Sequence, residues 1–219
     1  MNRDFEFKQL LRAYRSGIIS EETFESEMAQ LENGGASAAN GHGGGFRAFD
    51  KTYNSERDAI VSFIDKVRVA ESNAGIAFAK WVKVCRTECV RSGLRMIAER
   101  ESYHGRVFEA RLRDLGAECR AQASEESLKF ADYAADPDRA DSEKLMHISS
   151  LVGDTKKAIQ PIRDFAELIK QDLETKEMLR LFAEDELSST TWLRDSSAAL
   201  NADVTDVAAR DATAQPAAN

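Results

Sequence analysis

The chain has 219 residues, of which 42% are hydrophobic and 31% charged, a length and composition that fit one folded domain with additional segments. Its net charge of −8 argues against general nucleic-acid binding, because neutralising phosphates requires a basic face. No run of about 18 apolar residues could span a membrane, and the opening MNRDFEFKQLL lacks the layout of a signal peptide. We therefore expect a cytoplasmic protein with reduced thiols.

Helix is the expected secondary structure, since the sequence has only 12 glycines and 3 prolines and many strong helix formers. Two of its three cysteines, Cys85 and Cys89, form a C-x3-C pair near a predicted turn. This pair could be a redox or metal feature, although two partly buried thiols are the more common interpretation.

Residues 1–32 predict a small helical hairpin, with Gly17 between two apolar stripes and Ser20 as the N-cap of the second helix. The segment LLRAYRSGIISEETFESEMAQLE resembles the short helical hairpins called SHOCT domains, and this resemblance implies a role in assembly with a protein partner. A simple hairpin without a partner is the alternative. Residues 33–45, NGGASAANGHGGG, predict a flexible linker, so the main domain is expected to begin near Phe46.

Four long amphipathic helices are expected in the main domain, 46–198, from apolar residues that repeat at helical spacing. The connection between the second and third helices is far longer than antiparallel neighbours need. It therefore predicts a crossover, with up-down-down-up order and parallel second and third helices. The expected helices cover 55–85, 88–115, 141–170 with a kink or break at Pro161, and 175–198, with a short helix at 125–133 in the crossover and a disordered tail at 199–219.

Acidic side chains interrupt three of these apolar stripes. Glu71, Glu101 and Glu186 each take a heptad position that is apolar one heptad before and after. A lone carboxylate in a helical bundle costs several kcal/mol unless it is paired or bound to a metal. Three of them on three helices indicate a common site.

The predicted turns bring these carboxylates to one level. A turn near residue 86 lies midway between Glu71 and Glu101, and a turn near 170–173 lies midway between Asp154 and Glu186. His104 follows Glu101 at i+3, which places both side chains on one side of the helix. Carboxylates with imidazoles are the ligands of dinuclear iron and manganese bundles, so this set predicts such a centre.

The segments ERESYHGRVFEARLRDLG and LRLFAEDELSSTTWLRD resemble the second and fourth helices of the ferritin-like superfamily, particularly rubrerythrin and bacterioferritin. The resemblance covers about residues 55–197 and implies an all-α, ferritin-like four-helix bundle. It also implies that Glu71, Glu101, His104, Asp154 and Glu186 are metal ligands for iron or manganese.

Two departures from the family pattern affect this centre. Ser189 stands where the fourth helix would carry a histidine, and Asp154 replaces a longer glutamate on the third helix. One metal position is nearly complete and the other lacks its imidazole. A mononuclear, partly occupied or empty site is therefore an open alternative to the dinuclear one.

Two functions follow from these patterns. The first is a ferritin-like metal-binding protein that oxidises Fe(II) with oxygen or peroxide. No catalytic side chain is predicted for this function. The second is a non-catalytic bundle with a relic metal site, which acts in assembly through the N-terminal hairpin or the C-terminal tail. Ferritin-like bundles often pair through an open face, so we also expect a homodimer.

Overall fold

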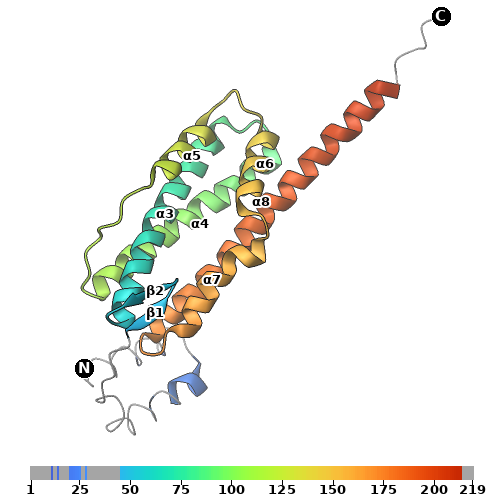
Figure 1. Cartoon of the computed structure of the whole chain (residues 1–219). Helices are drawn as coiled ribbons and strands as arrows, with labels where there is room; N and C mark the ends of the chain where they lie inside the picture. The colour runs from blue at the N-terminus through green and yellow to red at the C-terminus, as the bar shows by residue number, and fades with distance from the viewer. Residues whose placement is uncertain (1–10, 12–13, 15–19, 26–27, 29–44, 214–219) are drawn as a thin grey trace, which may run out of the picture. The chain divides into compact units, whose positions relative to one another are not determined.

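The computed structural model describes residues 11, 14, 20–25, 28 and 45–213, and these are mostly helical (Figure 1). The predicted all-α class is thus confirmed apart from one short β-hairpin. No helix in this part of the chain is long and apolar enough to cross a bilayer. The helices are α3 (Glu56–Val84), α4 (Glu88–Asp114), α5 (Glu125–Ala135), α6 (Asp141–Val152), α7 (Thr155–Leu168) and α8 (Leu173–Thr213).

The chain divides into two compact units, which are described separately. One comprises Met1–Ile64 with Ile159–Asp185, and the other comprises Asp65–Ala158 with Glu186–Asn219. The helices α3, α7 and α8 each contribute residues to both units. All residues of the candidate site belong to the second unit.

An antiparallel hairpin of β1 (Phe46–Ala48) and β2 (Lys51–Tyr53) begins the main domain in the first unit. Its two-residue turn holds Phe49 and Asp50 at φ of 51° and 57°, a conformation that non-glycine residues rarely adopt. The Phe49 ring lies 4.9 Å from the rings of both Phe63 and Phe165, measured between centroids. This aromatic packing offsets the backbone strain of the turn.

Only a few residues of the predicted N-terminal hairpin are described. The Ser20 hydroxyl accepts a hydrogen bond from the Thr23 amide at 3.2 Å, which confirms Ser20 as an N-cap. The rings of Tyr14 and Phe24 stack with centroids 4.6 Å apart. Residues 1–10, 12–13, 15–19, 26–27 and 29–44 lie outside the described residues, so the SHOCT-like assignment stays a prediction.

In the second unit, α3 and α4 form the predicted helical hairpin. The buried side of α4 carries the residues of the expected apolar stripe, including Glu101 and His104. The helix ends at Asp114, close to the expected stop at Gly116, whose φ of 64° reverses the chain. The Ala117 amide then donates to the Leu112 carbonyl at 2.9 Å, which closes the last turn of α4.

The connection at 115–140 runs alongside α3 in the same direction, as a long crossover requires (Figure 1). Near its beginning, the Ala121 amide donates to the Asp65 carboxylate at 2.7 Å, early in α3. Further along, the Phe130 ring of α5 meets the Phe78 ring at 5.9 Å, more than three turns later in α3. The chain therefore returns to the end of the unit from which α4 started.

Asp141 fixes this return. Its carboxylate accepts hydrogen bonds from Trp81 Nε1 at 2.9 Å and from the amides of Arg86 and Thr87 at 2.9 and 2.8 Å. Burial alone would raise the pKa of Asp141, but the hydrogen bonds outweigh it and lower the pKa below the ordinary value. Since Asp141 begins α6, both α6 and α4 start at the α3–α4 turn, as the predicted crossover requires.

The third predicted helix is broken at a different place from the one expected. Gly153, with φ of 61°, ends α6, and the Asp154 carboxylate caps α7 by accepting from the amides of Lys156 and Lys157 at 3.0 and 3.2 Å. Pro161 lies within α7 and does not end it. The glycine and the side-chain cap at 153–154, rather than the proline, therefore divide this segment.

The fourth helix is also longer than expected. It was predicted to end near Ala198, followed by a disordered tail at 199–219, whereas α8 continues to Thr213. This extension is rich in alanine, the best helix former, and the next proline is Pro216. The structure therefore has a helix where disorder was predicted for residues 199–213, and residues 214–219 lie outside the described residues.

We predict that Asp141→Asn destabilises the full chain by about 1–3 kcal/mol, because an amide nitrogen would then face one of the three buried donors. Urea unfolding followed by circular dichroism measures this loss. The exposed Asp138→Asn, which removes a charge from the same region, is the matched control. Equal unfolding midpoints for the two variants would show that Asp141 does not hold the crossover.

Candidate metal centre

Four polar side chains from three helices converge inside the second unit. Glu71 comes from α3, Glu101 and His104 come from α4, and Glu186 comes from α8. One potential ligand atom of each lies within 4.8 Å of those of the other three, and the first three residues are buried. The structure thus brings together four of the five ligands predicted from the sequence.

The ring of His104 lies between two of the carboxylates. Its Nδ1 is 3.3 Å from Glu71 Oε2 and 3.6 Å from Glu186 Oε1. Glu186 Oε1 is buried and has no hydrogen-bond partner among the described residues. A buried oxygen without a donor is costly, and a cation at this position would satisfy it.

Burial strongly favours the protonated form of these carboxyls. Burial, followed by the negative charge of Glu186, raises the pKa of Glu71 to about 8. Burial together with the hydrogen bond and charge of Glu71 raises the pKa of Glu101 to about 9. Burial and the charge of Glu101 raise the pKa of Glu186 to about 8. Without a cation, the cluster is therefore tolerable at neutral pH mainly because it holds protons.

A repeated motif accounts for the matching levels of Glu71 and Glu101. Residues 71–75 read ESNAG and residues 101–105 read ESYHG, so each glutamate is followed by a serine and, at i+4, by a glycine. Sequence reasoning singled out the glutamates and His104 but missed the serines and glycines. Two glycines inside long amphipathic helices, each four residues after a buried glutamate, were the signal that could have identified them.

The two motifs pack against each other. A Cβ atom added at Gly75 would lie 2.3 Å from Ser102 Oγ and 2.9 Å from Ser102 N. A Cβ atom added at Gly105 would lie 2.3 Å from Ser72 Oγ and 3.2 Å from Ser72 N. The missing side chains thus allow α3 and α4 to approach closely on both sides of the carboxylates. This approach places Glu71 within reach of Glu101 and His104.

The helix α8 is held against α4 by two further contacts. The Trp192 ring covers Gly93, where an added Cβ would lie 1.9 Å from the ring. Arg100 Nη1 donates to the Ser189 hydroxyl at 3.0 Å, and Ser189 is only 3% exposed. Sequence reasoning identified Ser189 as the substitute for a histidine but did not anticipate Arg100 as its partner.

Asp154, the fifth predicted ligand, lies outside the cluster. Its side chain is 52% exposed, and it caps α7 as described above. The prediction relied on one continuous third helix that would keep residue 154 facing the interior. The break at Gly153 removes that constraint, so the site is built by three helices rather than four.

The other histidine and cysteines of this unit lie outside the cluster. His147 is exposed and packs against the Tyr133 ring, with centroids 4.7 Å apart. The Cys85 thiol is buried and donates to the Thr87 carbonyl at 3.4 Å, and burial followed by the charge of Asp141 raises its pKa to about 11. Such a thiol is a poor nucleophile or metal ligand. Cys89 is exposed and free.

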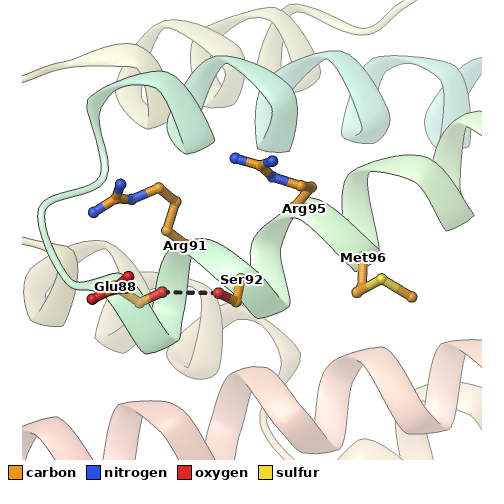
Figure 2. A pocket seen from close by; sticks show the side chains of 5 residues that line it. All are labelled: Glu88, Arg91, Ser92, Arg95 and Met96. Atoms are coloured by element: carbon orange, nitrogen blue, oxygen red, sulfur yellow. Dashed lines mark hydrogen bonds between the residues drawn. The ribbon is translucent and has the colours of Figure 1, made fainter.

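A surface pocket at the beginning of α4 is separate from the cluster (Figure 2). Arg91 and Arg95 extend from one side of the helix, whereas Ser92 hydrogen-bonds through its hydroxyl to the Glu88 carbonyl at 3.2 Å. None of the predicted ligands lines this pocket. Its chemistry is that of a charged helix surface.

We predict that Gly75→Ala is more destabilising than Gly105→Ala. At Gly75 the new methyl group meets the backbone of Ser102, so the helices must separate at a cost of about 1–3 kcal/mol. At Gly105 a serine hydroxyl is equally close, but the nearest backbone atom, Ser72 N, is 3.2 Å from the added Cβ rather than 2.9 Å. The strain is therefore smaller there, and the gain in helix propensity of about 1 kcal/mol, which both variants share, offsets more of it. Urea unfolding of both variants compares these costs, and equal midpoints would contradict the packing described.

We predict that the metal-free protein loses stability between about pH 5 and 9. The three carboxyls have folded-state pKa values of about 8 to 9, above the ordinary 4.5, so the folded chain holds protons that the unfolded chain has released. The stabilisation is complete below pH 4.5 and is lost as the pH rises through the folded pKa values. Urea unfolding with a chelator present should show a loss of at least about 3 kcal/mol.

Glu101→Gln is the control for this pH dependence, because glutamine stays neutral throughout. The variant should show a flatter decline over the same range than the unmodified chain. Stability that is constant between pH 5 and 9, or that declines equally in both proteins, would mean that Glu101 ionises freely in the folded state.

Comparison of the chain with protein-family models, with curated proteins and with solved structures found no match. The assignment of the cluster therefore rests on its own geometry. Three carboxylates and an imidazole nitrogen within 4.8 Å of one another, in a largely buried place, form a group that could hold a metal ion.

Proposed function

We propose that this chain is a metal-binding protein whose centre consists of Glu71, Glu101, His104 and Glu186. The observation that carries the proposal is the convergence of these four side chains, with ligand atoms within 4.8 Å, in a part of the chain where charge is costly. Glu186 Oε1, which is buried without a hydrogen bond, also supports it. We extend the proposal to a ferritin-like bundle, in line with the motifs on α4 and α8 and with the crossover.

The donor set indicates the class of metal. Oxygen ligands alone suit magnesium or calcium, whereas a mixed set with one imidazole nitrogen suits first-row transition metals. His104 would bind through Nδ1, which is the ring nitrogen that faces Glu71 and Glu186. Iron or manganese is the proposed occupant, because carboxylate-rich bundles of this kind favour these metals.

Binding of a cation would release the protons that the three carboxyl groups hold. Glu71, Glu101 and Glu186 have raised pKa values, so a metal must displace the protons that they hold at neutral pH. Affinity should therefore increase with pH. The close packing of α3 and α4 through Gly75 and Gly105 would keep the ligands fixed and limit access of water.

Oxidoreductase activity is the finer part of the proposal. Bound Fe(II) would supply an electron to oxygen or peroxide, which is chemistry that amino-acid side chains alone do not perform. The residues of this chain would hold the ion through three carboxylates and His104, and would keep bulk water away.

A non-catalytic role is the second candidate, and two observations favour it. Asp154 is withdrawn to the surface, and Ser189 bonds to Arg100 instead of offering an imidazole. The remaining carboxyls can also satisfy one another by sharing protons, as their raised pKa values show. In this case the centre would be a relic, and the protein would act through assembly.

Elemental analysis of the full chain, purified without chelator and without an affinity tag that binds metal, separates these functions. We predict a stoichiometric transition metal that is lost in Glu101→Gln, because this change removes an anionic ligand from the middle of the cluster. Glu99→Gln, an exposed change two residues away on α4, is the matched control and should retain the metal.

Reconstitution with Fe(II) or Mn(II) under anaerobic conditions completes the test. Bound metal should raise the unfolding midpoint of the unmodified chain and of Glu99→Gln, with little effect on Glu101→Gln. If neither ion binds the unmodified chain at neutral pH, the metal-binding function is wrong and the assembly role remains.

A further inference from the structure

Arg100 carries a fixed positive charge next to the proposed centre. It directly precedes Glu101 on α4, and its Nη1 donates to the hydroxyl of Ser189, which lies three residues after Glu186 on α8. The guanidinium is thus held next to Glu101 along α4 and, through Ser189, about one turn from Glu186 along α8.

We propose that Arg100 takes the place of a second metal ion, so that the centre binds a single divalent cation. This inference rests on the proposed metal-binding function and deepens it. It assigns a role to a residue that contacts no metal in the proposal and that the ligand pattern of the sequence did not include.

The charges of the cluster support one ion. Three ionised carboxylates are neutralised by one divalent cation together with the Arg100 guanidinium, when His104 is a neutral ligand. A second divalent cation would leave two uncompensated positive charges in a largely buried place. Uncompensated charge at such a site costs several kcal/mol, so the second ion would bind weakly or not at all.

The spacing of the ligands also supports one ion. Transition metals bind oxygen and nitrogen at about 2.0–2.2 Å, so two ligands on opposite sides of one ion lie about 4.4 Å apart. One potential ligand atom from each of the four residues lies within 4.8 Å of the others, which fits one coordination sphere.

The positions that would complete a second sphere are used otherwise. Ser189, at the place of the missing histidine, accepts the hydrogen bond from Arg100. Asp154, at the place of the missing glutamate, caps α7 on the surface. The two departures from the dinuclear pattern therefore remove ligands, while Arg100 supplies the positive charge that a second ion would have contributed.

Equilibrium dialysis of the full chain against Mn(II), with metal content measured by elemental analysis, tests the proposal. We expect one manganese per chain at saturation. Arg100→Gln should bind the first ion at least about tenfold more tightly, because a repelling positive charge is removed, and should begin to take up a second. Arg100→Lys keeps the charge and should resemble the unmodified chain.

Arg95→Gln is the matched control, since it removes an exposed arginine from the same helix and should change the affinity by less than about threefold. If Arg100 were only a structural partner of Ser189, Arg100→Gln would weaken binding and Arg100→Lys would not restore it. That result, or two ions bound by the unmodified chain, would overturn the proposal. Absence of any binding would instead refute the metal-binding function itself.

Discussion

The close approach of α3 and α4 is the constraint on which the candidate centre depends. Gly75 and Gly105 leave no room for a side chain. At each of these glycines the backbone of one helix therefore contacts a serine of the other helix, on either side of the buried glutamates. Glu71 and Glu101 are therefore held together although their like charges repel. Because separating the packed helices would cost free energy, the carboxylates cannot move apart. Their negative charge must instead be neutralised by a cation or by protons.

Several sources can neutralise this cluster, and they compete. Protons do so at neutral pH, as the raised pKa values of Glu71 and Glu101 indicate. His104 and Arg100 contribute through hydrogen bonding and charge. A divalent cation would replace protons and satisfy Glu186 Oε1 directly. Whether the site functions as a metal centre is thus decided by the free-energy difference between a protonated cluster and a metal-bound one.

Periodicity predicted the helices and most of the centre, because heptad positions report which residues face the interior. It placed Glu71, Glu101 and Glu186 together, and it failed at Asp154, where it assumed an unbroken helix. It also missed the β-hairpin, since the Phe49–Asp50 turn lacks a glycine and depends on packing against Phe165, more than 100 residues away. Contacts between distant segments are not visible in local patterns.

The exposed position of Asp154 and the charge of Arg100 both affect the number of positive charges that the cluster can hold. A metal ligand is useful only if its backbone is held in place, and the positive φ of Gly153 with the cap formed by Asp154 ends helix α6 there. Because the Asp154 carboxylate lies outside the interior, the cluster has three acidic groups. The charge of two divalent ions would exceed the negative charge of these three groups. An arginine bound to the neighbouring helix supplies one positive charge without needing ligands. Under the proposed function, the exposed position of Asp154 and the fixed charge of Arg100 thus both favour a site for one ion.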